Sequence, residues 1–236
     1  NIIIEKSLQN SNLNNLSKLE ILKTKLLEVR QKRQKPFFDD KTQTDLNSFW
    51  ITTLLHTSFV LNDETLLKKS IQMFELLEKR LNKKIFHCYE SEKNSGVFLE
   101  DYAYYCQMLI TLYECTSDER YLRQTEQMMN DTWTLFYDEK NKILQKNPVK
   151  KNDLFVNPVD INDNNISNGN SIFLNVSQKL ELITEKKEWK TKVEDLSKTF
   201  HSYINLNSTQ MFSYLKYLDI VEEKITFTFF GDIKKM

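Results

Sequence analysis

The chain has 236 residues, in which 33 lysines and arginines are balanced by 33 aspartates and glutamates. A net charge of zero argues against a nucleic-acid-binding surface and against binding to an anionic membrane surface. Only three glycines and three prolines are present, too few for a β-rich or loop-rich fold. The length suffices for a sizeable core, and we expect one domain over residues 1–236.

Apolar residues recur at helical spacing along most of the chain, which predicts an all-α fold. Residues 45–61 and 99–115 are apolar on most faces, as expected of doubly buried inner helices, whereas 63–81 and 118–136 are amphipathic and read as outer helices. The predicted helices, in chain order, span residues 16–33, 45–61, 63–81, 99–115, 118–136, 171–183, 187–203 and 208–221.

A three-fold repeat groups these helices into pairs. Residues 62–70 (NDETLLKKS) resemble residues 117–125 (SDERYLRQT), and residues 184–192 (TEKKEWKTK) form a weaker copy. Each copy opens with a residue that favours a helix start and then becomes apolar at helical spacing. A recurrence of this length is typical of stacked helical hairpins.

The connections within pairs are short, whereas residues 82–98 and 137–168 form long connections between pairs. This pattern favours a helical-hairpin (α/α) toroid or solenoid, with about three hairpins and flanking helices. Short β segments are predicted in the long connections, at 84–89 and 143–145, and at the C-terminal end, at 225–230.

A polar cluster precedes or opens the first helix of each pair. If the hairpins stack in parallel, all the clusters lie on one rim of the fold. The clusters are Asp39-Asp40-Lys41, Glu100-Asp101-Tyr102 and Asn168-Gly169-Asn170-Ser171.

The first cluster follows a helix that carries Arg30 and Arg33, three residues apart and therefore on one helix face. Two arginines in this arrangement suit a clamp on a carboxylate or other anionic ligand. The alternative is structural: the acids of the cluster cap the next helix and pair locally with the arginines.

The third cluster opens a helix with exposed backbone N–H groups, which suits binding of hydroxyls or anions, and the preceding loop brings Asp160 and Asp163 to the same place. The second cluster suits acid–base chemistry on a sugar. Glu100 and Asp101 stand in the first turn of an inner helix, where the helix dipole favours acids even without a catalytic role. A pair of carboxyl groups across a pocket performs glycoside hydrolysis, and we expect Asp101 with Asp40 or Asp163 to form that pair. His87, in the first long connection, is a candidate base or an ordinary surface residue.

Neither a metal nor a cofactor is expected. Cys88, Cys106 and Cys115 form no CxxC pair and have no ligand-like spacing to the three histidines. We expect free thiols and a cytoplasmic location. No apolar run of transmembrane length and no signal peptide are present, so no membrane partner is expected.

Three ordered motifs carry a family resemblance. Arg30-x-x-Arg33-x-x-Pro36 with Asp39-Asp40-Lys41 and Asn47 resembles a signature of the YyaL-like family of thioredoxin-domain-containing, spermatogenesis-associated proteins. The stretches 99–103 (LEDYA) with 112–114 (LYE), and 163–171 (DNNISNGNS), are similar to two further motifs of that family. Leu46, Ser48, Ser167 and Asn168 depart from its pattern.

The resemblance implies a six-hairpin, glycosidase-like (α/α) toroid, of which this chain supplies a part, with a thioredoxin-like domain in the same gene product. It implies a rim pocket for a carbohydrate-like ligand, lined by Asn47 and Tyr102 among others, with sugar-epimerase or glycosidase chemistry. A non-catalytic scaffold module beside the thioredoxin-like domain is the alternative. A partial toroid also predicts self-association through exposed apolar edges.

Overall fold

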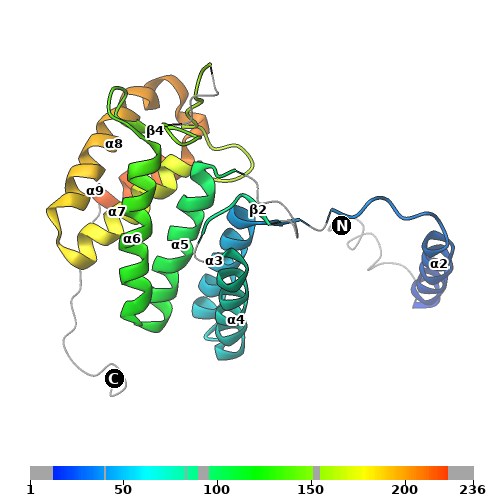
Figure 1. Ribbon diagram of the computed structural model, residues 1–236. Coiled ribbons are helices and arrows are strands. Elements are labelled where there is room, and N and C mark those ends of the chain that lie inside the picture. The colour runs from blue at the N-terminus through cyan, green and yellow to red at the C-terminus, as the bar shows by residue number, and fades with distance from the viewer. Residues whose placement is uncertain (1–12, 40, 83, 90–95, 151–154, 223–236) are drawn as a thin grey trace. The chain divides into compact units, whose positions relative to one another are not determined.

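The computed structural model describes residues 13–39, 41–82, 84–89, 96–150 and 155–222 (Figure 1). The chain divides into two compact units, Asn1–Asp40 and Lys41–Met236, which are described separately. The sequence-based expectation of one domain over the whole chain stays a prediction.

The described part of the first unit contains the helix α2 (Leu13–Gln31), where a helix was expected at 16–33. It ends before Arg33, so the expectation that Arg30 and Arg33 share one helix face is wrong. Arg30 lies in its last turn, and the backbone N–H of Arg33 donates a hydrogen bond to the Arg30 carbonyl at 3.1 Å. Arg30, Arg33 and Asp39 belong to this unit, and Asp40 lies outside the described residues. The site described below is therefore built from the second unit alone.

The described residues of the second unit form three helical hairpins followed by a final helix. All of its predicted helices are present. Most of their first and last residues lie within three residues of the predicted positions. The hairpins are α3 (Thr44–Leu61) with α4 (Glu64–Leu81), α5 (Leu99–Thr116) with α6 (Glu119–Phe136), and α7 (Gly169–Thr184) with α8 (Lys187–Asn207); a 3-10 turn (Ser208–Gln210) and α9 (Phe212–Glu222) follow.

The first helices of the three hairpins lie side by side, with α5 packed between α3 and α7 (Figure 1). The second helix of each hairpin packs on the first helix of the same hairpin. The inner position of α5 explains its composition, because it is covered by α3, α6 and α7 and most of its side chains are buried. One core cluster joins α3, α4 and α5, and a larger one joins α5 to α7, α8 and α9 around Trp189, Tyr104 and Phe173.

The turns inside the hairpins explain the sequence repeat. Asn62, Ser117 and Glu185 each adopt a positive φ, of 52°, 56° and 55°, and end the first helix of their pair. Asp63 and Asp118 then cap the second helix through their side chains. The third copy is shifted by one residue and has no side-chain cap, which accounts for its weaker resemblance.

Two short β-ribbons form in the connections. β1 (Thr42–Gln43) pairs antiparallel with β2 (Cys88–Tyr89), and β3 (Tyr137–Asp138) pairs antiparallel with β4 (Ile143–Leu144). The predicted β segments in the two long connections are thereby confirmed. The segment predicted at 225–230 lies outside the described residues.

Several large apolar side chains of α3 remain more than half exposed, including Trp50, Phe59 and Val60. The self-association expected from such edges stays a prediction. Within the described part of the chain, every helix is too short or too polar to cross a membrane.

Candidate functional site

The first turns of the three inner helices meet on one rim. The Leu99 N–H at the start of α5 donates to the Lys146 carbonyl at 2.9 Å, and Thr44 N–H at the start of α3 donates to the His87 carbonyl at 3.0 Å. Gly169, the first residue of α7, lies so near α5 that a Cβ there would stand 2.8 Å from Leu99 Cγ. The parallel stacking inferred from the repeat therefore holds for α3, α5 and α7.

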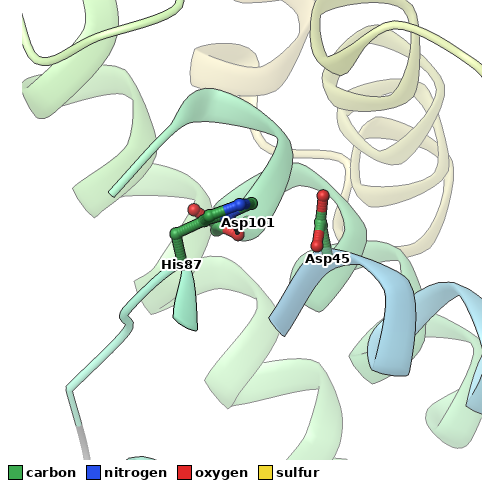
Figure 2. Close-up of side chains that lie close together, drawn as sticks. All are labelled: Asp45, His87 and Asp101. Atoms are coloured by element: carbon green, nitrogen blue, oxygen red, sulfur yellow. Dashed lines mark hydrogen bonds and ion pairs between the residues drawn. The ribbon is translucent and has the colours of Figure 1, made fainter. Parts of the chain in front are cut away.

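The floor of this rim is a cluster of Asp45, His87 and Asp101 (Figure 2). One ligand atom of each side chain lies within 4.8 Å of those of the other two. His87 Nδ1 is 3.0 Å from Asp101 Oδ1, and Asp101 Oδ2 accepts a hydrogen bond from the Phe98 N–H at 2.8 Å. Asp101 is fully buried, and this desolvation raises the pKa of its carboxyl group.

A cavity of about 330 Å³ opens above this floor. Its walls come from the starts of α3, α5 and α7 and from both long connections. The lining residues are Asp45, His87, Phe98, Glu100, Lys146, Asp160, Asn162, Asn164, Ile166, Ser167 and Asn168.

Glu100 differs in environment from the other acids of the cavity. Its Oε2 is buried and has no hydrogen-bond partner among the described residues. Burial raises the pKa of the Glu100 carboxyl, and the nearby Asp160 carboxylate acts in the same direction while Lys146 opposes it. Asp160 is itself paired with Lys146, whose Nζ lies 2.8 Å from Asp160 Oδ2. Two acids with contrasting surroundings thus line one cavity.

The loop before α7 is held by its own polar side chains. Asn168 caps α7 by accepting the Ser171 N–H at 2.9 Å, and its Nδ2 donates to Asp163 Oδ1 at 2.9 Å. The other oxygen of Asp163 accepts the Ser213 N–H. Asn170 is fully buried and bonds to the backbone of Leu144 and Asp160.

The structure thus divides the residues predicted for the site. It brings His87, Glu100, Asp101 and Asn168 together at the cavity or just beneath it. Asp163, Asn170 and Ser171 make the hydrogen bonds that shape the loop, and neither the cavity nor the floor cluster includes them.

Two further predicted residues make contacts outside the cavity. Asn47 donates to the Gln43 carbonyl at 2.7 Å. Tyr102 packs edge-on against Phe136 of α6, and burial raises the pKa of its phenol to about 12. Lys41 opens the second unit but does not line the cavity.

Sequence reasoning missed Asp45 and Lys146 as site residues, and it placed Asp160 beside the third cluster without assigning it a role. Asp45, like Glu100, is an acid in the first turn of an inner helix. The reasoning that predicted Glu100 as a site residue therefore applies equally to Asp45. Lys146 and Asp160 lie within an irregular connection, where no periodicity shows which side chains converge.

No protein-family model matches the chain, and no curated protein matches it. Several solved structures are similar to it. One is a glycoside hydrolase family 76 α-1,6-mannanase from Salegentibacter sp. HEL1_6 (TM-score 0.54, 13% identity, 84% of this chain and 57% of that chain). An inactive variant of the same enzyme, in which two consecutive aspartates are replaced by asparagine, is in complex with α-1,6-mannotriose (TM-score 0.53, 12% identity, the same coverage).

A family 76 mannosidase from Bacteroides thetaiotaomicron VPI-5482 is also similar (TM-score 0.51, 13% identity, 69% of this chain and 44% of that chain). This chain spans little more than half the length of the mannanase. At such low identity the likeness concerns the fold alone, and the thioredoxin link implied by the sequence motifs receives no support from it. The fold is that of the (α/α) toroids.

Proposed function

We propose that the rim cavity binds a carbohydrate chain and hydrolyses a glycosidic bond, with an α-linked mannoside as the substrate class. The observation that carries the proposal is the convergence of Glu100, Asp160, Lys146 and the amides of the 162–168 loop in one cavity. Hydroxyl-rich ligands are bound by such mixtures of carboxylates, amides and an ammonium group, and Phe98 adds an apolar surface for a sugar face.

Glu100 and Asp160 fit the two roles that glycoside hydrolysis requires. One carboxyl group must donate a proton to the leaving oxygen, and the other must act as a carboxylate on water or on the sugar. Burial favours the protonated form of Glu100, which suits the proton donor. Asp160, held beside Lys146, provides the carboxylate.

The structural neighbours support the substrate class. The mannanase variant in complex with α-1,6-mannotriose is described as inactive after replacement of two consecutive aspartates. This chain carries the consecutive acids Glu100 and Asp101 at the start of its central inner helix, one lining the cavity and one buried below it. The acid–base roles predicted for Asp101, Asp163 and His87 stay predictions outside this proposal: His87 Nδ1 faces Asp101, and Asp163 accepts hydrogen bonds from Asn168 and Ser213.

The test compares binding and turnover in matched variants. α-1,6-Mannotriose and a maltotriose control are titrated into the protein by calorimetry, and reducing ends are counted after incubation with each. Glu100→Gln is expected to retain binding while turnover falls about 10²- to 10⁴-fold, the contribution typical of a general acid. Glu119→Gln makes the same change at the exposed start of α6 and is expected to leave both unchanged.

The outcomes separate the alternatives. Binding without turnover in the unaltered chain would make the cavity a carbohydrate-binding module and exclude hydrolysis. An absence of binding to both sugars at millimolar concentration, or a Glu100→Gln variant that turns over normally, would refute the proposal.

A further inference from the structure

The floor cluster has the composition of a metal site. Asp45 comes from the first turn of α3, His87 from the first long connection, and Asp101 from the first turn of α5 (Figure 2). Their ligand atoms, all within 4.8 Å of one another, include one imidazole nitrogen and two carboxylate oxygens. Ligands of a tetrahedral zinc ion stand roughly 3.5 Å apart, because the metal–ligand bonds are about 2.0–2.2 Å long. Side-chain movements of about 1 Å would close the set around an ion.

The two carboxylates of the cluster have one possible positive partner within it, His87, which lies 3.0 Å from Asp101 and can balance at most one of them. Two carboxylates face each other beside a single imidazole, and neither forms an ion pair with a lysine or arginine among the described residues. Lys146, the lysine of the cavity wall, is paired with Asp160 instead. A divalent cation would neutralise both carboxylates at once.

The ligands are already oriented by their neighbours. The Phe98 N–H donates a hydrogen bond to Asp101 Oδ2, and the Leu46 N–H donates one to Asp45 Oδ1 at 2.7 Å. One oxygen of each carboxylate is therefore fixed by a backbone hydrogen bond. The backbone of His87 is bonded on both sides, through its N–H to the Gly96 carbonyl and through its carbonyl to Thr44. Such surrounding hydrogen bonds are a regular part of metal centres because they fix ligand direction.

The side chain of Gln43 completes the arrangement. Its amide nitrogen lies 3.4 Å from His87 Nε2. When Nδ1 gives its lone pair to a metal, Nε2 carries the proton, and rotation of the Gln43 amide by 180° presents its oxygen as the acceptor. Metal-binding histidines commonly donate their second N–H in this way.

We propose that Asp45, His87 and Asp101 bind one zinc ion, with a fourth position open toward the cavity. One nitrogen and two oxygen ligands without a thiolate suit zinc better than calcium or magnesium, which prefer oxygen alone, or copper(I), which prefers sulfur. The ion joins the starts of α3 and α5 and the first long connection. The three ligands are separated by 42 and 14 residues (45 to 87 and 87 to 101), so no ligand spacing reveals them in the sequence.

The experiment measures zinc binding by competition with a chromophoric chelator after treatment of the full chain with EDTA. One equivalent is expected to bind to the unaltered protein, and magnesium and calcium are expected to compete poorly. Asp45→Asn and His87→Gln are expected to weaken zinc binding at least tenfold. His87 is more accessible than Asp101, with 23% of its side chain exposed against none for Asp101, so His87→Gln tests the site even where Asp101→Asn fails to fold.

Three control variants exclude other sources of binding. His201→Gln changes an exposed histidine, Asp160→Asn changes a cavity acid outside the cluster, and Cys88→Ser removes the thiol next to His87. All three are expected to bind zinc within twofold of the unaltered chain. Loss of binding in Cys88→Ser, unchanged binding in Asp45→Asn and His87→Gln, or no stoichiometric binding at all would each overturn the proposal.

The metal site and the carbohydrate pocket are tested separately. Glu100→Gln is expected to bind zinc as the unaltered chain does, and zinc binding is read without any sugar. A chain that binds mannotriose but not zinc refutes the metal site alone, and one that binds zinc but no sugar refutes the pocket alone.

Discussion

Asn170 and Leu144 exchange two hydrogen bonds: the Leu144 N–H donates to Asn170 Oδ1 at 3.0 Å, and Asn170 Nδ2 donates to the Leu144 carbonyl at 2.8 Å. The Asn170 side chain thus makes the pair of hydrogen bonds with Leu144 that a neighbouring β-strand would otherwise make with β4. The same Nδ2 also donates to the Asp160 carbonyl at 3.1 Å. Asn170 therefore ties both halves of the second long connection to the start of α7.

We expect Asn170→Ala to lower the free energy of unfolding by about 2–4 kcal/mol, because it leaves buried backbone groups of Leu144 without partners. Urea unfolding followed by circular dichroism measures the loss. Asn175→Ala is the control, since Asn175 lies on the same helix and bonds only to the carbonyl one turn before it. A loss in Asn170→Ala no larger than in the control would contradict the role given to this side chain.

Gly169 sets the distance between α7 and α5. A Cβ at this position would stand 2.8 Å from Leu99 Cγ and 3.1 Å from Leu99 Cδ2, so Gly169→Ala must displace the Leu99 side chain at the start of α5. Overpacking of this kind costs roughly 1–3 kcal/mol. Unfolding measurements are expected to show that loss, together with weaker sugar binding through displacement of Glu100. Gly96→Ala, where a Cβ meets nothing within 4 Å, is expected to change neither property.

Asp138 anchors the turn between β3 and β4. Desolvation acts to raise the pKa of its carboxyl, but hydrogen bonds from Asn141, Lys140 and Gln145 outweigh it, and the folded-state pKa is lowered from 3.8. A lowered pKa means that this stabilisation is present above pH 3.8 and is lost as the pH falls through the folded-state value.

We expect Asp138→Asn to be less stable than the unaltered chain by about 1 kcal/mol at pH 7, a value discounted for solvent exposure. The difference should shrink below pH 3.8. Denaturant unfolding at pH 7 and at pH 3 tests this, with the exposed Glu139→Gln as the reference. A difference that stays the same at both pH values would show that the charge of Asp138 contributes nothing.

Lys192 is almost fully buried between Trp133 and Trp189, with its ammonium 5.5 Å and 4.1 Å from the two ring centroids. Desolvation lowers its pKa from 10.5, and the charge of Glu188 only partly opposes this. The unfolded chain therefore binds this proton more tightly than the folded chain, so stability rises with pH in the window below 10.5.

Lys192→Met removes this dependence. The free energy of unfolding of the unaltered chain, measured relative to Lys192→Met, is expected to increase between pH 7 and pH 10. Lys190→Met, at an exposed position on the same helix, is expected to show no such trend. If the free energy of unfolding of the unaltered chain relative to Lys192→Met instead fell as the pH rose, the prediction would be wrong.

The helices and their pairing were predictable from the sequence because both depend on neighbours along the chain. Capping residues such as Asp63 and Asp118, and apolar residues at helical spacing, act within a turn or two of helix. The alignment of the repeat placed Glu100, Asp101 and Asn168 at equivalent helix starts. The repeat thereby predicts that they share one rim.

Only the tertiary structure decided which polar groups face the cavity and which serve the fold. Asp163 and Asn170 were predicted for the site, and in the structure they bond to Ser213 and Leu144, which lie 50 and 26 residues away in the chain. Asp45, His87 and Asp101 meet because β1 pairs with β2 and α3 packs on α5. Periodicity and capping fix each helix by itself, whereas a site depends on side chains from separate connections, whose positions follow from packing across the whole rim.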